Sequence, residues 1–174
     1  MYAQVHTINA IHVGEIGPEE ALVAVDESGR VSVWFTATLD QPPIRLENGV
    51  STWGIATHGP TYLLAVSANS FRITVWDLRD RSPEEKSTMR VYPEAPLGEG
   101  CTRRTFSGHT HNIPSVDISP SGRWLVSCSI DGSCRIWRLR DGRCVKQRSL
   151  APSWYAAFRI VFVRVLYSTN IWSI

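Results

Sequence analysis

The fold is decided by the stretch Gly108-His-Thr-His-Asn-Ile-Pro-Ser-Val-Asp-Ile-Ser-Pro-Ser-Gly-Arg-Trp-Leu-Val-Ser-Cys-Ser-Ile-Asp-Gly-Ser-Cys-Arg-Ile-Trp137. Its short apolar runs are separated by a Ser-Pro-Ser-Gly turn and by the Asp131-Gly132 dipeptide, which favours a tight hairpin. Together with the segment after Trp137, it predicts one four-stranded antiparallel sheet. We expect its strands near residues 113–119, 124–130, 134–139 and 144–150.

Two earlier stretches repeat this pattern. Trp34 and Trp76 each close an apolar strand and stand 42 residues apart, whereas Trp137 follows Trp76 by 61 residues. Residues 81–100, which contain several Pro, Glu and Gly, supply the excess and are typical of an exposed loop inserted near an outer strand. The sequence therefore predicts three repeats, each ending its third strand on a tryptophan.

This spacing resembles the WD repeat, whose four-stranded blades build β-propellers. We expect an all-β chain with a partial WD40-type propeller over residues 1–158. Its blades would cover about 7–48, then 50–80 with the inserted loop 81–100, then 101–150, and residues 159–174 form an unassigned apolar tail. The alternative is three generic hairpins in a sandwich, which does not explain the tryptophan spacing.

The resemblance also implies a hydrogen-bonded tetrad in the third repeat. It assigns the loop histidine to His109, the turn acid to Asp131 and the indole to Trp137, with Ser129 as the strand hydroxyl and Ser127 as second choice. The first two repeats have serine at the acid position, so they are expected to rely on apolar packing. We interpret this tetrad as structural and assign it no ligand.

The composition excludes several classes of function. A chain with 43% hydrophobic residues, 20% charged residues and a formal net charge of +2 gives no reason to expect an anionic membrane surface or direct nucleic-acid binding. No signal peptide is apparent, and the most apolar segment, residues 155–167, is too short to span a membrane. We expect an intracellular protein, nuclear or cytoplasmic.

The sequence shows no motif for catalysis, a cofactor or a metal. The four cysteines lack zinc-site spacing, and the pair His109 and His111 has no third ligand at a suitable distance. No nucleophile, phosphate loop or Ser-His-Asp arrangement is evident. Cys128 and Cys134 flank one turn and could face each other, but a disulfide is disfavoured because nothing indicates secretion.

Three phrases are more particular: residues 8–17, residues 51–58 and residues 111–118. Together they resemble a fungal WD-repeat family named for constitutive ribonucleotide-reductase transcription, over roughly residues 7–158. The resemblance implies a non-enzymatic regulatory role linked to ribonucleotide-reductase genes. Members are longer than this chain, so we expect a fragment of a longer propeller, with pairing to a second chain as the alternative.

Trp76-Asp77-Leu78-Arg79 satisfies the W-D-x-R pattern that resembles the docking motif of cullin-4-type ubiquitin-ligase substrate receptors. Asp77 would fix the strand end while Arg79 offers a planar donor group to the adaptor. The equivalent third-repeat stretch ends on Arg140 but carries Arg138 in place of the acid. Candidate docking residues are therefore Asp77, Arg79 and Arg140, with plain surface arginines as the alternative.

Asp117 lies in an otherwise apolar strand, where a buried charge is costly unless it is paired. We expect this side chain to line the central channel. The partners expected overall are other proteins, including a ubiquitin-ligase adaptor.

Overall fold

Antiparallel strands make up nearly all the regular structure. A computed structural model of the chain describes residues 6–79 and 103–149. Within these ranges the only helical segments are two single-turn 3-10 helices, η1 (Thr36–Thr38) and η2 (Gly59–Thr61). The prediction of an all-β chain is therefore confirmed.

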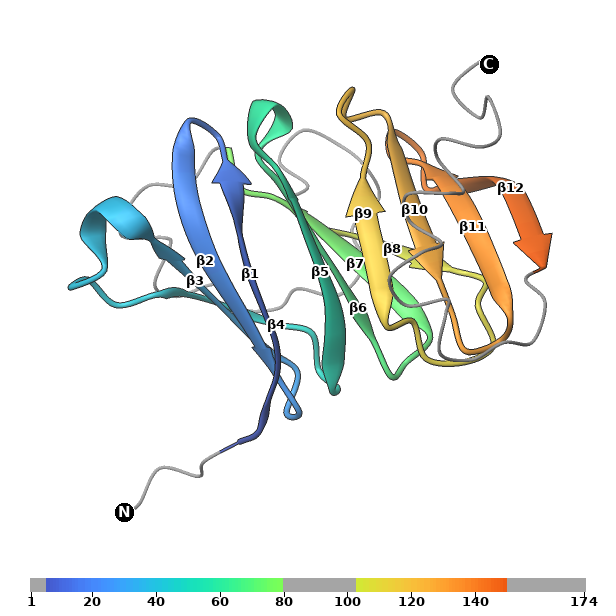
Figure 1. The fold of residues 1–174 in the computed structure, drawn as a ribbon, viewed down its shortest axis with the longest axis horizontal. Helices are drawn as coiled ribbons and strands as arrows, with labels where there is room; N and C mark the ends of the chain where they lie inside the picture. Colours follow the sequence, from blue (N-terminus) through green and yellow to red (C-terminus); the bar gives the residue numbers. More distant parts are fainter. Residues whose placement is uncertain (1–5, 80–102, 150–174) are drawn as a thin grey trace.

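The strands form three four-stranded antiparallel sheets, each wound in chain order, which stand side by side as the blades of a partial β-propeller (Figure 1). Blade 1 comprises β1 (Ile8–Ile16), β2 (Glu19–Asp26), β3 (Arg30–Phe35) and β4 (Ile44–Glu47). Blade 2 comprises β5 (Thr52–His58), β6 (Leu63–Ala68), β7 (Arg72–Asp77) and β8 (Arg103–Ser107). Blade 3 comprises β9 (Ser115–Ile118), β10 (Trp124–Cys128), β11 (Ser133–Arg138) and β12 (Arg143–Ser149).

The strands of blade 3 lie where the sequence predicted them, in a single sheet. One boundary was wrong. Residues 103–107, which we placed in the third repeat, form β8 and pair with β7 of blade 2. The outer strand of blade 2 is therefore supplied after the long insertion, and blade 3 begins at β9.

Two apolar cores fill the spaces between the blades. Trp76 of blade 2 packs into the core shared with blade 1, and Trp137 of blade 3 packs into the core shared with blade 2. Both indoles are almost fully buried, at 2% and 1% exposure. Trp34, on the equivalent strand of blade 1, pairs with Leu22 on the face turned away from blade 2, and it is only half-buried.

Polar contacts join neighbouring blades at both ends of the strands. Between blades 1 and 2, the Asn9 side chain donates to the carbonyl oxygen of Thr52 at 2.8 Å. Between blades 2 and 3, the Ser67 hydroxyl donates to the carbonyl oxygen of Ile113. At the opposite end, His58 Nε2 lies 3.0 Å from the carbonyl oxygen of Pro120. Because that oxygen can only accept, Nε2 carries the proton and donates.

The turns between second and third strands carry different residues at the position that has a positive φ angle. Gly29 in blade 1 and Gly132 in blade 3 have φ angles of 90° and 78°, which favour glycine. Blade 2 has Phe71 at the equivalent position with φ of 62°. A bulky residue in this region costs about 1–2 kcal/mol, so this turn is strained.

The expectation that Cys128 and Cys134 stay unbridged was wrong for this structure, which joins them as a disulfide. They are directly opposed across β10 and β11, with 4.3 Å between their Cα atoms. The strand register brings the two sulfurs together as their places on either side of the turn suggested, and in this structure that proximity outweighs the absence of any sign of secretion.

Some predictions fall on residues 1–5, 80–102 and 150–174, outside the described ranges. They include the inserted loop 81–100 and the apolar tail 159–174. In the part of the chain that is described, no helix is long and apolar enough to cross a membrane.

Candidate interaction surfaces

A chain of hydrogen bonds crosses the interior of blade 3. The Trp137 indole N–H donates to Ser127 Oγ at 2.8 Å, and Ser127 Oγ lies 2.7 Å from His109 Nε2. His109 Nδ1 lies 2.8 Å from Asp131 Oδ2. The carboxylate can only accept, so Nδ1 carries the proton and Nε2 accepts from the serine hydroxyl. A neutral imidazole satisfies every donor and acceptor in this series.

Asp131 binds the turn and the incoming loop at once. Its Oδ1 accepts from Ser133 N at 2.9 Å and from Ser133 Oγ at 2.6 Å, while Oδ2 also accepts from Thr110 N at 3.0 Å. Burial acts to raise the pKa of Asp131, but the bonds from Ser133, Thr110 and His109 outweigh it and hold that pKa well below the usual range. The carboxylate is therefore charged throughout the neutral range.

The environment keeps His109 neutral. Burial is the main cause that lowers the pKa of His109, and the bond to Asp131 only partly opposes it. The imidazole side chain has 0% exposure. This agrees with the proton positions deduced from the hydrogen bonds.

The serine assignment is corrected. Ser127, our second choice, bridges His109 and Trp137, whereas Ser129 donates to the carbonyl oxygen of Asn112 at 2.9 Å and accepts from the Asp131 N–H at 3.1 Å. Ser129 lies just beyond the end of β10, so it holds the turn and the preceding loop instead of the indole.

The tetrad thus contains a Ser-His-Asp series, Ser127–His109–Asp131, although the sequence shows no motif for nucleophilic catalysis. Ser127 has 0% exposure, and its oxygen already accepts the indole proton. A nucleophilic serine must reach a substrate carbonyl, and this one has no access to solvent. The arrangement links a loop and two strands and offers no group to a ligand.

Blade 1 has a different polar turn, which the sequence analysis missed. Asp26 Oδ1 accepts from Ser28 N at 2.9 Å, Ser28 Oγ at 2.6 Å and Arg30 N at 3.0 Å. The expectation that blade 1 relies on apolar packing alone was wrong. An aspartate two residues before a serine was the available signal.

The W-D-x-R residues lie at one rim of blade 2. The Asp77 carboxylate accepts the Arg79 backbone N–H at 3.0 Å, and the Arg79 guanidinium lies 5.8 Å from the centre of the Tyr62 ring. The Arg79 side chain is 54% exposed. Arg140 is still more open, at 77%, and its nearest carboxylate is Asp141 at 4.0 Å. The structure thus leaves both guanidinium groups accessible at the strand ends.

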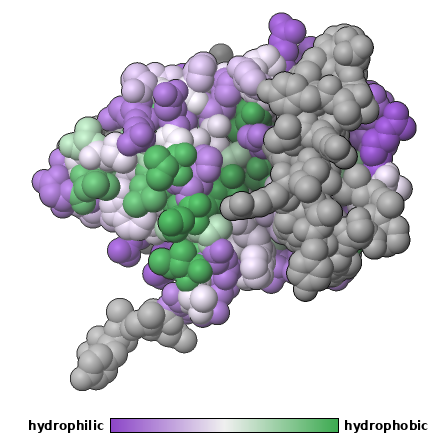
Figure 2. Space-filling view, in the orientation of Figure 1, coloured by the Kyte–Doolittle hydropathy of each residue, from purple (hydrophilic) through white to green (hydrophobic). Residues whose placement is uncertain are grey.

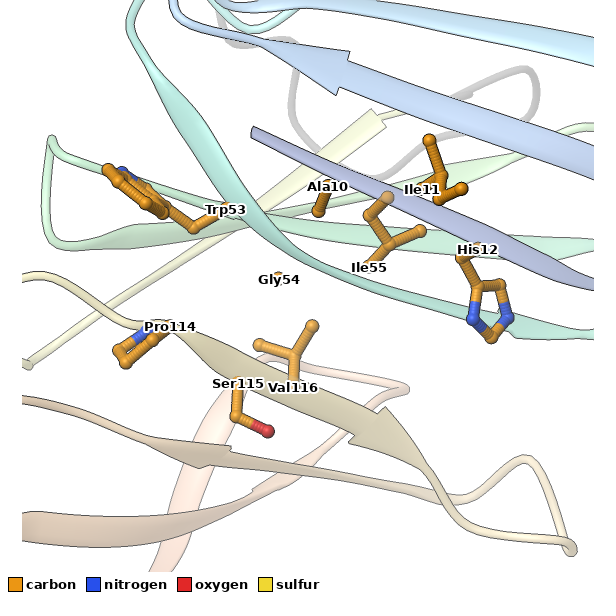
Figure 3. Close-up of a pocket in the computed structure, with 9 residues that line it drawn as sticks. All are labelled: Ala10, Ile11, His12, Trp53, Gly54, Ile55, Pro114, Ser115 and Val116. Atoms are coloured by element: carbon orange, nitrogen blue, oxygen red, sulfur yellow. The ribbon is translucent and has the colours of Figure 1, made fainter. Parts of the chain in front are cut away.

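A second surface lies on the inner side of the arc, where β1, β5 and β9 run side by side (Figure 1). Residues 10–12, 53–55 and 114–116 line a small pocket there (Figure 3). The Trp53 ring forms one wall and His12 another. The sequence analysis did not single out this pocket, because its three walls come from three separate repeats.

No group of three or more His, Cys, Asp or Glu side chains suited to a metal occurs in the described ranges. His109 is committed to the tetrad, and exposed His111 accepts from the Asn112 N–H through Nδ1.

Comparison with known proteins agrees with this architecture. Residues 100–138 match the family described as WD domain, G-beta repeat. The chain contains a WD40 repeat. It is 42% identical over 146 residues to a WD40 repeat-containing protein of Dictyostelium discoideum, a match that covers 83% of this chain and 20% of that protein.

Two further relatives match parts of this chain. A WD repeat-containing protein of Schizosaccharomyces pombe is 31% identical over 140 residues, covering 80% of this chain and 28% of that protein. A ribosome biogenesis protein BOP1 homolog of Arabidopsis thaliana is 36% identical over 69 residues, covering 40% of this chain and 8% of that protein. The chain thus spans less than a third of the length of the relatives that it matches.

Proposed function

We propose that this chain is part of a non-enzymatic WD-repeat scaffold that binds other proteins. The observation that carries the proposal is the location of the polar groups, which are either buried inside a blade or accessible at its surface. The Ser127–His109–Asp131 series is sealed inside blade 3, while the accessible groups lie at the rim and on the inner side of the arc. Among residues 6–79 and 103–149, the accessible groups thus form surfaces suited to a partner, and the buried Ser127–His109–Asp131 series presents no reactive group to a substrate.

The more specific proposal is a regulatory role in the transcription of ribonucleotide-reductase genes, in the nucleus or cytoplasm. It rests on the resemblance of residues 8–17, 51–58 and 111–118 to the fungal family. The BOP1 homolog matches only 40% of this chain and 8% of its own length, so we do not carry its role over.

Native affinity purification of the tagged full-length protein from its own cells tests the scaffold function. We expect at least one protein partner in stoichiometric amount, retained by the wild type and lost when blade 3 is unfolded by Trp137→Asp. Deletion of the gene should change ribonucleotide-reductase transcript levels. Recovery of no stoichiometric partner would contradict the scaffold, and unchanged transcripts would contradict only the regulatory role.

A second candidate is a substrate receptor of a cullin-4-type ubiquitin ligase. It is favoured by the half-exposed Arg79 side chain beside Asp77. Binding of the purified adaptor should be lost in Arg79→Ala, weakened in Arg140→Ala and retained in Arg45→Ala, which changes an exposed arginine on the outer strand of blade 1. Equal binding by Arg79→Ala and the wild type would exclude docking through this motif.

A further inference from the structure

The pocket on the inner side of the arc has the size of a single side chain. Its volume is about 150 Å³, below the 300–1,000 Å³ typical of sites for cofactors or drug-sized ligands. It forms where β1, β5 and β9, the free edges of the three sheets, approach one another (Figure 3). Edge strands present unpaired backbone groups, which suit an extended peptide.

One wall is a fixed aromatic ring. Trp53 is 40% exposed, and its indole N–H donates to Asn69 Oδ1 at 2.6 Å. The bond holds the ring in place while leaving part of its surface open. An exposed aromatic ring attracts a cationic group and also covers the methylene groups of its side chain.

A carboxyl group lies on the same face of β9 as one of the residues that line the pocket. Asp117 and Ser115 are opposed to Val126 and Cys128 of β10, so the two share one face of β9, and Ser115 lines the pocket. Two residues along a strand span about 6.6 Å, which is within the reach of a lysine or arginine side chain. Asp117 is half-buried.

This carboxylate has little to balance its charge. The hydrogen bond that it accepts comes from the adjacent Ile118 N–H at 2.8 Å, and within residues 6–79 and 103–149 no lysine or arginine forms an ion pair with it. Burial raises the pKa of Asp117, whereas His12 acts in the opposite direction. Burial also lowers the pKa of His12, so the imidazole is largely neutral at pH 7 and does not supply the missing positive charge.

We propose that this pocket receives a lysine or arginine side chain from an extended segment of a partner protein, with Asp117 as its counter-charge. Trp53 covers the aliphatic part of the incoming side chain, and the free strand edges bind its backbone. The inference rests on the proposed scaffold function and specifies what one of its surfaces recognises.

The test uses fluorescein-labelled pentapeptides, Gly-Ala-X-Ala-Gly, in which X is arginine, lysine, glutamine or glutamate. Fluorescence anisotropy with the full chain should show the arginine and lysine peptides binding about tenfold more tightly than the glutamine peptide, equivalent to about 1.4 kcal/mol. The glutamate peptide should bind least. Absence of binding by the arginine peptide, or equal affinity for the arginine and glutamine peptides, overturns the proposal.

Two variants make the test specific. Asp117→Asn keeps the size of the side chain, and it should remove the preference for cationic peptides without lowering the melting temperature. Asp40→Asn, which removes an exposed carboxylate of blade 1, should bind as the wild type does. Retention of the cationic preference by Asp117→Asn overturns the assignment. If the peptides do not bind while native purification still recovers a partner, the scaffold function is supported and this inference is wrong.

Discussion

At the scale of single residues, the interior of blade 3 depends on one hydroxyl group. Ser127 accepts from the Trp137 indole and donates to His109, and all three side chains are buried. A buried donor or acceptor that loses its partner costs about 1–3 kcal/mol. The role of this hydroxyl can therefore be measured by removing it.

We expect Ser127→Ala to lower the free energy of unfolding by about 2–4 kcal/mol, because it leaves both an indole N–H and an imidazole nitrogen unsatisfied. Denaturant unfolding of the full chain measures this. Ser107→Ala, at the exposed end of β8, should change stability by less than about 0.5 kcal/mol. Equal effects of the two substitutions would show that the hydrogen-bonded series contributes nothing.

Stability should fall as the pH drops below neutral. The lowered pKa of His109 means that the unfolded chain takes up a proton near its ordinary value of 6.5 while the folded chain does not. The free energy of unfolding should thus decrease between pH 7.5 and pH 5.5, by at most about 1.4 kcal/mol per pH unit for each such histidine.

His12 has a lowered pKa as well, so His12→Gln is the control that isolates His109. If the free energy of unfolding of this variant still decreases as the pH falls, the result supports a neutral His109 in the tetrad. Asp131, with its lowered pKa, adds a loss only in stronger acid, as the pH falls below the ordinary aspartate value. A flat profile between pH 7.5 and pH 5.5 would contradict the deduced proton positions.

The sequence identified His109, Asp131 and Trp137, but it ranked Ser127 second to Ser129 for a definable reason. Gly-His, Asp-Gly and the strand-ending Trp137 have fixed places in the repeat. Ser127 and Ser129 are two residues apart, and strand periodicity puts both on one face. Only the end of β10 at Cys128 separates them, and strand ends are poorly determined by composition.

At the scale of elements, the turns between second and third strands test backbone conformation. A Cβ added to Gly132 would meet nothing within 4 Å, so Gly132→Ala should cost only the conformational penalty of about 1–2 kcal/mol. At Gly29 the added Cβ would lie 2.4 Å from the Val50 backbone nitrogen, so Gly29→Ala should cost more. Denaturant unfolding of both variants compares them, and equal losses would be inconsistent with the close approach.

Sequence alone predicted the positions of these turns but not the strain in one of them. Asp131-Gly132 and Ser28-Gly29 are typical turn pairs. Phe71 takes the same conformation because β6 and β7 pair in the same register on either side of it. Pairing of the flanking strands outweighs the local preference of phenylalanine, a result that propensity does not anticipate.

At the scale of the whole molecule, the repeat period predicted three sheets, and the structure contains them. The contacts that join the sheets were not predictable in the same way. His58 reaches Pro120 across 62 residues, and Ser67 reaches Ile113 across 46, with no shared motif. Pocket residues 10–12, 53–55 and 114–116 likewise come together only when the blades stack.

One sheet face of the arc carries apolar side chains that no described residue covers. Ile11 and Val13 of β1 are 70% and 58% exposed, and Leu22 and Trp34 lie on the same face. Figure 2 shows hydrophobic side chains gathered along this side of the molecule. Exposed apolar surface of this kind promotes association.

The central claim is that these residues form an arc of propeller blades whose first sheet is open on one face. Size-exclusion chromatography with light scattering of the 174-residue chain tests it most directly. We predict self-association by the wild type, reduced toward the 19.5 kDa monomer by the double substitution Ile11→Lys and Val13→Lys. A sharp wild-type monomer peak near 19.5 kDa with a single cooperative melt would contradict the open arc and indicate a self-contained domain.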